Sequence, residues 1–323
     1  MPEISVVIPL YNKGPYIARA IQSVLNQTEQ SFEIIIVEGR STDEGPKVVK
    51  SFKDQRIFFF EQGGSGVSAA RNEGVSHSQS DFIAFLDADD EWMPTHLETL
   101  LRLKKSMPEA GLYCTAYKVI EISGRIRDVK IEGVPNPPWE GIIPSFFRTA
   151  ALAENPSWTS VVGIRKEVFQ EAGGFPENVW YGEDTYLWGI IALKHPIAFS
   201  WDIGAIYYKD ASNRTCHRLE PIQENIFVNT AKKAIQSGEV PPGVSVDLQA
   251  YIARKQIELA YRNLIIGEPG LARHNLRECN SKHLIGWRYL ILLFTYLPPR
   301  LFSQFVRLKD FLKERSVIKH KAI

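Results

Sequence analysis

Cysteine is scarce in this sequence, and the features that mark export or a membrane span are absent. The three cysteines, Cys114, Cys216 and Cys279, have no paired spacing, which argues against a disulfide framework and against a zinc site. The chain starts Met-Pro-Glu-Ile, with an acid where a signal peptide needs basic charge, and no apolar run reaches the roughly 18 residues of a spanning helix. We therefore expect a protein of a reducing compartment, with the cytoplasm as the default.

Two nucleotide-binding motifs are also missing. The chain has no G-x-x-x-x-G-K-[ST] loop, and Gly63, Gly64 and Gly66 lack the spacing of a dinucleotide fingerprint. We interpret these glycines as turn residues.

What the sequence does contain is an ordinary globular composition with an uneven distribution of charge. Of its 323 residues, 44% are hydrophobic and 23% are charged, which suits one large domain or a domain with an appendage. Residues 281–323 hold nine of the 38 Lys/Arg and two of the 37 Asp/Glu. The tail is therefore strongly basic and the rest of the chain is acidic.

The first part of the chain alternates apolar runs with helical patterns. The runs are Ile4–Pro9, Phe32–Val37, Arg56–Glu61 and Phe82–Leu86, and helical spacing of apolar residues follows each. This alternation predicts an α/β fold with a doubly wound, mainly parallel sheet. Right-handed crossovers would bring the loops after the first, second and fourth runs to one edge.

The later part of the chain has a different organisation. Residues 112–122 and 125–129 predict a hairpin, and a helix is expected from Glu183 to about Lys194. Helical patterns then dominate, over 222–237, 247–266 and 271–280. We therefore predict an α/β domain over 1–218, a helical appendage over 219–280 and a basic amphipathic tail over 281–323.

The run Phe82–Leu86 ends in a cluster of carboxylates, Asp87, Asp89, Asp90 and Glu91. Parallel sheets bind ligands beyond their strand ends, and hard cations such as Mg²⁺ or Mn²⁺ take oxygen ligands and bridge to phosphates. One interpretation is thus a metal-diphosphate site.

The alternative is an acidic loop that only caps the next helix. Thr95 and Glu98 have the spacing of a T-x-x-E capping box after Pro94.

A second pair of acids, Glu183 and Asp184, opens the predicted helix. Carboxylates in a first turn are favoured by the helix dipole, which is the simpler explanation. The pair also lies among aromatic residues, including Trp180 and Tyr181, as in a sugar-binding cleft. Both interpretations stay open on pattern alone.

Six stretches in order resemble one family, the family-2 glycosyltransferases of the GT-A fold, an inverting group that uses nucleotide sugars. They are Ser5 to Asn12, Ser41 to Asp43, Gly66 to Asn72, Asp87 to Asp90, Gly173 to Phe175 and Gly182 to Asp184. The likeness covers roughly residues 4–214 and implies a GT-A (Rossmann-like) fold with a mainly parallel sheet flanked by helices.

The resemblance implies roles for the nucleotide side of a site. Pro9, Tyr11 and Glu38 would line the nucleotide pocket with Arg71 nearby, and Asp87 would face the ribose.

The resemblance also implies roles for the residues that take part in the reaction. Asp89 would coordinate Mn²⁺ or Mg²⁺, and Asp184 would be the general base, with Glu183 and Trp180 on the acceptor side. An inverting displacement needs one carboxylate to take the acceptor proton and a Lewis acid for the departing diphosphate.

Two departures from the family leave parts of this picture open. The chain reads Glu38-Gly39-Arg40-Ser41 where many members carry a second acid that faces uracil, so the base is left open. Many relatives carry Tyr-Arg-x-His near the end of the domain, where this chain has Tyr208-Lys209-Asp210-Ala211.

The tail has its own interpretation. Residues 287–297 are nearly all apolar, and apolar residues recur among basic ones over 302–315. Such a segment suits the interface of an anionic membrane. The alternative is a helix that packs on the α/β domain with a solvated basic face.

The resemblance to this family implies a metal-dependent hexosyltransferase in cell-surface polysaccharide synthesis. Its partners would be a nucleotide-sugar donor, a glycan or lipid-linked acceptor and an anionic membrane surface, without nucleic acid. We expect it in the cytoplasm, peripheral at the inner face of the cell membrane. The alternatives are a nucleotidyltransferase, which would release pyrophosphate, and a degenerate nucleotide-sugar-binding module without activity.

Overall fold

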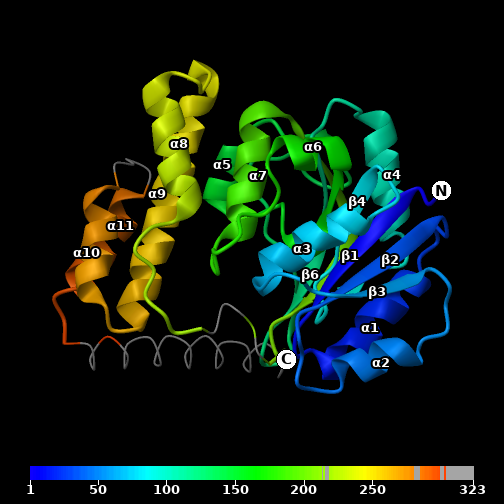
Figure 1. Ribbon diagram of the computed structural model, residues 1–323. Coiled ribbons are helices and arrows are strands. Elements are labelled where there is room, and N and C mark those ends of the chain that lie inside the picture. The colour runs from blue at the N-terminus through cyan, green and yellow to red at the C-terminus, as the bar shows by residue number, and fades with distance from the viewer. Residues whose placement is uncertain (213, 215–217, 280–283, 299–301, 303–323) are drawn as a thin grey trace, which may run out of the picture. The chain divides into compact units, whose positions relative to one another are not determined.

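Ten strands form one sheet in the first of the two units into which the chain divides, Met1–His217 and Arg218–Ile323. The computed structural model describes residues 1–212, 214, 218–279, 284–298 and 302 (Figure 1). Cys216, His217 and most of the predicted basic tail lie outside the described residues.

The sheet has the order β3-β2-β1-β4-β9-β6-β10-β5, with β7 paired to β6 and β8 to β10. Its strands are β1 (Ile4–Leu10), β2 (Phe32–Glu38), β3 (Ile57–Glu61), β4 (Phe82–Phe85), β5 (Glu91–Trp92), β6 (Leu112–Ile120), β7 (Ile126–Asp128), β8 (Glu140–Ile142), β9 (Val162–Arg165) and β10 (Ile197–Tyr208). The first four strands are parallel, and β9 runs antiparallel to both of its neighbours. The predicted mixed, mainly parallel sheet and the β6–β7 hairpin are confirmed.

Helices flank the sheet on both sides (Figure 1). They are α1 (Gly14–Leu25), α2 (Gly45–Ser51), α3 (Gly66–His77), α4 (His96–Ser106), α5 (Phe146–Leu152), a 3₁₀ turn η1 (Thr159–Val161), α6 (Lys166–Glu171) and α7 (Glu183–Lys194). On one face, Phe85 of β4 packs 5.3 Å from the ring of Phe175, which follows α6, and 6.1 Å from Trp188 of α7. On the other, Lys104 of α4 lies 4.8 Å from the ring centre of Phe82.

The apolar runs form strands because both of their faces are covered. Every residue of β2 and β4 is buried, as expected for strands between two helical layers. In register, Leu10 pairs with Glu38 and Val7 with Phe85, so β1, β2 and β4 end at the same edge. The loops that follow them therefore meet there, as the sequence predicts.

The predicted capping box at the start of α4 is wrong. Thr95 is the N-cap residue, but its side chain makes no capping hydrogen bond. Glu98 accepts a hydrogen bond from the Thr28 hydroxyl at 2.8 Å. The Glu98 carboxylate thus binds a residue of the α1–β2 connection and does not cap its own helix.

The second unit is helical, as predicted for the C-terminal part. It contains α8 (Ile226–Ser237), α9 (Pro242–Ile265), α10 (Pro269–Arg277) and α11 (Ile285–Phe294). Two helices begin earlier than predicted, at Pro242 and Pro269, because proline is favoured at a first helical position. Within the described ranges, no helix is both long enough and apolar enough to cross a bilayer.

Candidate active site

Arg71 of α3 joins two acidic segments that are far apart in the sequence. Its guanidinium donates to Asp87 Oδ1 at 2.7 Å and to Glu183 Oε1 at 3.1 Å, and it lies 5.0 Å from the ring centre of Phe175. The side chain is buried, which disfavours charge, yet Asp87 and Glu183 outweigh burial and raise its pKa. The arginine stays charged and fixes the end of β4 beside the start of α7.

A second set of hydrogen bonds shapes the loop after β4. The Asp87 backbone N–H donates to Ser160 Oγ at 3.1 Å, and the Ser160 hydroxyl donates to Asp90 Oδ2 at 2.8 Å. The Tyr208 backbone N–H donates to Asp90 Oδ1. Burial and the neighbouring carboxylates of Asp89 and Asp87 raise the pKa of Asp90 well above its usual range. Asp90 therefore anchors the loop from inside.

Asp89 lies at the accessible side of this loop. Its Oδ2 accepts from Lys13 Nζ at 2.7 Å, and Lys13 also donates to the Ser212 carbonyl at 2.7 Å. Arg19 donates to the Asp89 carbonyl at 2.6 Å. Lys13, in the loop after β1, thus links the loop after β4 to the segment after β10.

The donor set fits a hard cation held partly by substrate. Asp89 offers a carboxylate oxygen, and its side chain is 14% exposed, whereas Asp87, 27% exposed, is held by Arg71. Among the described residues, no group of three or more His, Cys, Asp or Glu side chains is placed to hold a metal. Mg²⁺ is commonly bound by one or two carboxylates with substrate phosphates and water completing the shell, and Asp89 suits that mode.

Helix α7 is preceded by its N-cap residue Gly182, which is in the left-handed region with φ of 80°. Burial, with the Asp184 charge adding to it, raises the pKa of Glu183 to about 7, although Arg71 opposes the shift. The Asp184 Oδ1 accepts from the Thr185 N–H at 2.6 Å. Asp184 therefore has a first-turn hydrogen bond, whereas Glu183 is bound to Arg71.

The loops after β1 and β2 form the edge next to this cluster. Tyr11 is 60% exposed, and Pro9 is half-buried near the end of β1. Glu38 is buried, and its carboxylate accepts from the Ser41 backbone N–H and from the Ser41 hydroxyl. An exposed aromatic ring thus stands at this edge, while Glu38 shapes the loop beneath it.

Gly39 has little space around it. A Cβ at this position would lie 2.9 Å from Gln62 Oε1 and 3.3 Å from the Leu10 carbonyl oxygen. Gln62 is buried and donates to the Gly66 carbonyl at 2.8 Å. Arg40, which follows, is exposed in the left-handed region with φ of 64°.

Two groups of aromatic side chains lie near the acidic segments in the sequence or in the fold. Trp180 and Tyr181 have ring centres 5.8 Å apart just before α7. Trp158 lies 4.5 Å from Tyr207 and 5.0 Å from Tyr117, at the carboxyl ends of β10 and β6. Tyr117 is buried, so in the second group only Trp158 and Tyr207 are partly exposed.

Sequence reasoning missed Lys13, Ser160 and Trp158 as members of this region. The position of Lys13 could have indicated its role, since it follows the first strand in the turn Tyr-Asn-Lys-Gly-Pro. No sequence pattern indicated Ser160, because its role depends on the packing of η1 against the loop after β4.

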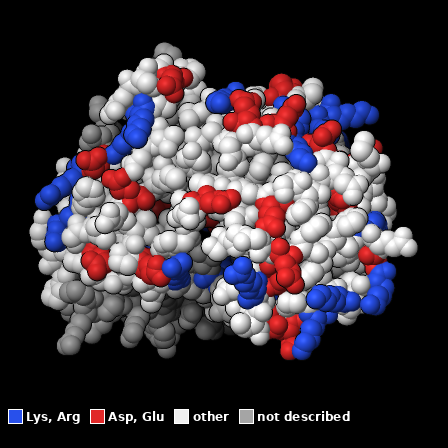
Figure 2. Space-filling view, viewed as in Figure 1, with Lys and Arg blue, Asp and Glu red and all other residues white. Residues whose placement is uncertain are grey.

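Acidic and basic side chains are intermixed on the face seen in Figure 2.

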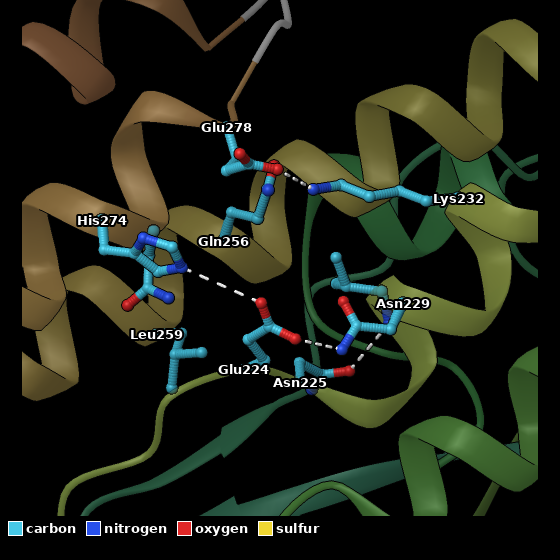
Figure 3. A pocket seen from close by; sticks show the side chains of 10 residues that line it. Glu224, Asn225, Asn229, Lys232, Gln256, Leu259, His274 and Glu278 are labelled. Atoms are coloured by element: carbon cyan, nitrogen blue, oxygen red, sulfur yellow. Dashed lines mark hydrogen bonds and ion pairs between the residues drawn. The ribbon is translucent and has the colours of Figure 1, made fainter.

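A cavity of about 20 Å³ in the second unit is lined by polar side chains that include Glu224, Gln256 and His274 (Figure 3). It has room for about one water molecule and is too small for a nucleotide sugar. The candidate site is the edge around Asp87, Asp89 and Asp184, because Arg71 joins its two acidic segments there.

Comparison with known proteins gives one consistent family. The family model described as "Glycosyl transferase family 2" matches residues 5–171. An uncharacterised glycosyltransferase of Nostoc sp. is 36% identical over 302 residues, 89% of this chain and 89% of its own length. One of Rickettsia bellii is 34% identical over 196 residues, 60% of this chain and 27% of its own length. The chain spans less than a third of the Rickettsia relatives that it matches.

Solved structures share the fold at low identity. S. aureus TarS 1–349 in complex with UDP-GlcNAc has a TM-score of 0.69 at 15% identity, covering 96% of this chain and 92% of that one. The mannosyltransferase PcManGT of Pyrobaculum calidifontis, in complex with GDP-Man and Mn²⁺, has a TM-score of 0.58 at 19% identity, covering 94% and 83%. The expected GT-A fold is confirmed by this likeness.

Proposed function

The chain belongs to glycosyl transferase family 2, and from that membership we propose that it transfers a hexose from a nucleotide-diphosphate donor with inversion. The observation that supports this most directly is the Arg71 bridge, which holds the Asp87 loop and the Glu183–Asp184 pair at one sheet edge. A donor and an acceptor must be bound next to each other to react, and the bridge keeps the residues assigned to each close together.

In the proposed reaction, the acceptor hydroxyl oxygen attacks the anomeric carbon of the donor sugar. The bond between that carbon and the diphosphate oxygen breaks, and nucleoside diphosphate leaves with the electron pair. Asp184 accepts the hydroxyl proton, since an inverting displacement needs one base and no covalent intermediate. Glu183 and Trp180 are assigned to the acceptor side.

The donor side is assigned to the residues around β1, β2 and β4. Pro9 and Tyr11 line the nucleotide pocket beside Glu38, and Asp87 faces the ribose. The exposed ring of Tyr11 supports this, because an aromatic side chain at a strand end can stack on a base.

Asp89 is assigned to a bound Mn²⁺ or Mg²⁺. Such a cation supplies charge neutralisation for the diphosphate. Lys13, at 2.7 Å from the same carboxylate, adds positive charge at this position and keeps Asp89 oriented.

The acceptor class is proposed to be a glycan or lipid-linked sugar in cell-surface polysaccharide synthesis. TarS and PcManGT are named with UDP-GlcNAc and GDP-Man, respectively. These two bases differ, so the donor base is best determined by direct measurement.

The first experiment is calorimetric titration of the purified chain with UDP, GDP, dTDP and CMP, each with and without Mn²⁺. We expect metal-dependent binding of one nucleotide, lost in Asp89→Ala and retained in Asp128→Ala. Asp128 is a suitable control because its side chain is 75% exposed in the β6–β7 hairpin. If none of the nucleotides binds, the transferase proposal fails and a degenerate module takes its place.

Product analysis separates the remaining enzyme alternative. With donor and acceptor supplied, a glycosyltransferase releases nucleoside diphosphate, whereas a nucleotidyltransferase forms pyrophosphate. Detection of pyrophosphate as the product would refute the proposal.

A further inference from the structure

Helix α11 is packed on one side only. Ile291 is 3% exposed and belongs to a core with Leu264 and Leu276 of the same unit. Arg288 Nε donates to the Leu276 carbonyl at 3.0 Å, and Arg273 donates to the Thr295 carbonyl at 2.9 Å. These contacts fix the rotation of the helix against α10.

The opposite side of α11 and the turn after it is apolar and exposed. We call this the α11 apolar face; its members are Ile285, Tyr289, Leu290, Leu293, Tyr296 and Leu297. Trp287 is also exposed, but it lies one turn before Ile291, toward the packed side. Tyr289, Leu293 and Tyr296 are 59%, 62% and 70% exposed and recur at helical spacing. Of the sixteen exposed large hydrophobic residues described, seven lie in this stretch, whereas the others are scattered. Such a concentration marks an interaction surface.

The chemistry of the face is that of a membrane interface. Tyrosine and tryptophan are enriched at the headgroup level of bilayers because their rings are apolar and their tips are polar. No acid occurs between residues 285 and 298. Arg273 borders the face, with its guanidinium 5.3 Å from the ring centre of Tyr296.

The adjoining sequence is basic. Residues 299–323 contain seven Lys/Arg and two Asp/Glu. A segment with such an excess of basic residues is attracted to the headgroups of anionic lipids. A second copy of the chain would also cover the face, but it would bring two basic segments together, and their repulsion opposes that arrangement.

We propose that the α11 apolar face docks on an anionic lipid surface, with the helix lying in the plane of the interface. The helix has ten residues and a length of about 15 Å, half of a bilayer core, so it lies on the membrane. The inference extends the proposed function, since a lipid-linked acceptor is presented at such a surface.

Co-sedimentation of the full chain with vesicles tests the proposal. Phosphatidylcholine vesicles with and without phosphatidylglycerol are compared for wild type and for Tyr289→Ser/Leu293→Ser/Tyr296→Ser. We expect binding only to the anionic vesicles and a loss of roughly tenfold or more in the triple variant. The matched control, Ile122→Ser/Leu152→Ser/Val246→Ser, alters three exposed apolar residues elsewhere and should bind as wild type does.

Two further measurements make the outcome decisive. Thermal unfolding followed by circular dichroism shows that both triple variants fold, and nucleotide titration of the same samples shows whether the candidate active site is intact. Wild type that ignores anionic vesicles, or a triple variant that binds them equally, would overturn the proposal. The proposal would also be overturned if wild type forms a dimer and binds no lipid, while the triple variant is a monomer. If wild type binds anionic vesicles but binds no nucleotide, the result counts against the proposed function and leaves the lipid proposal standing.

Discussion

Arg71 holds Asp87 at 2.7 Å and Glu183 at 3.1 Å, although 112 positions separate the arginine from the glutamate. The guanidinium is 5% exposed, and its two partners come from the loop after β4 and the first turn of α7. One buried cation therefore sets the spacing between the proposed donor and acceptor sides.

Arg71→Met should destabilise the protein by about 3 kcal/mol, because Asp87 and the buried Glu183 lose the cation and the hydrogen bonds that hold them together. Urea unfolding followed by tryptophan fluorescence measures the change. Arg148→Met is the control, since Arg148 is an exposed arginine on α5 and its loss should change stability by less than about 0.5 kcal/mol. Equal unfolding midpoints for both variants would contradict the role given to the bridge.

Glu183 should make stability depend on pH. Its pKa is raised from 4.5 to about 7 in the folded protein, so the folded state keeps the proton over a range where the unfolded chain has lost it. The stabilisation from this group is complete below pH 4.5 and is lost as pH rises toward 7, by up to roughly 3 kcal/mol.

Unfolding free energies of wild type and Glu183→Gln, measured from pH 5 to 8, check this expectation. The glutamine cannot ionise, so the downward slope between about pH 5 and 7 should be smaller in the variant. Parallel curves would show that Glu183 ionises normally in the fold.

Asp184→Asn should strongly lower kcat while leaving donor binding unchanged. The amide oxygen can still accept from the Thr185 N–H, so the start of α7 is kept, but the side chain can no longer take a proton. A loss of roughly 10²- to 10⁴-fold in kcat is expected for a missing general base. Glu167→Gln removes a first-turn carboxylate from α6 and serves as the control, because its side chain is 77% exposed. Unaltered turnover in Asp184→Asn would refute the base assignment.

The sequence predicted the sheet and most helices because their signals are local. Fully apolar runs such as Phe32–Val37 form strands wherever two helical layers cover them, and the first-turn acids place the start of α7. The capping box at Thr95 failed because a distant hydroxyl, that of Thr28, competes for Glu98. The links Lys13–Asp89 and Ser160–Asp90 were not predicted for the same reason, since each joins segments about 70 or more residues apart.

Position 39 should not tolerate a side chain, because Gln62 lies against Gly39. An alanine at 39 would bring a Cβ to 2.9 Å from Gln62 Oε1, in a place where Gln62 is held by its bond to the Gly66 carbonyl. We expect Gly39→Ala to cost about 1 kcal/mol of stability, because the glutamine must leave a buried position. Gly63→Ala is the matched control, since its Cβ would meet only Glu73 at 3.9 Å and should leave stability nearly unchanged.

The same pair allows a test of base choice. Gly39→Asp adds a second acid directly after Glu38, but Gln62 occupies the space beside it. We expect Gly39→Asp alone to weaken nucleotide binding and Gly39→Asp/Gln62→Ala to recover it, with UDP gaining relative to GDP. Calorimetric titration of the two variants with both nucleotides gives the comparison. If the double variant keeps the wild-type order of affinities, the base is read elsewhere, and Gly39 only closes the turn between β2 and the following loop.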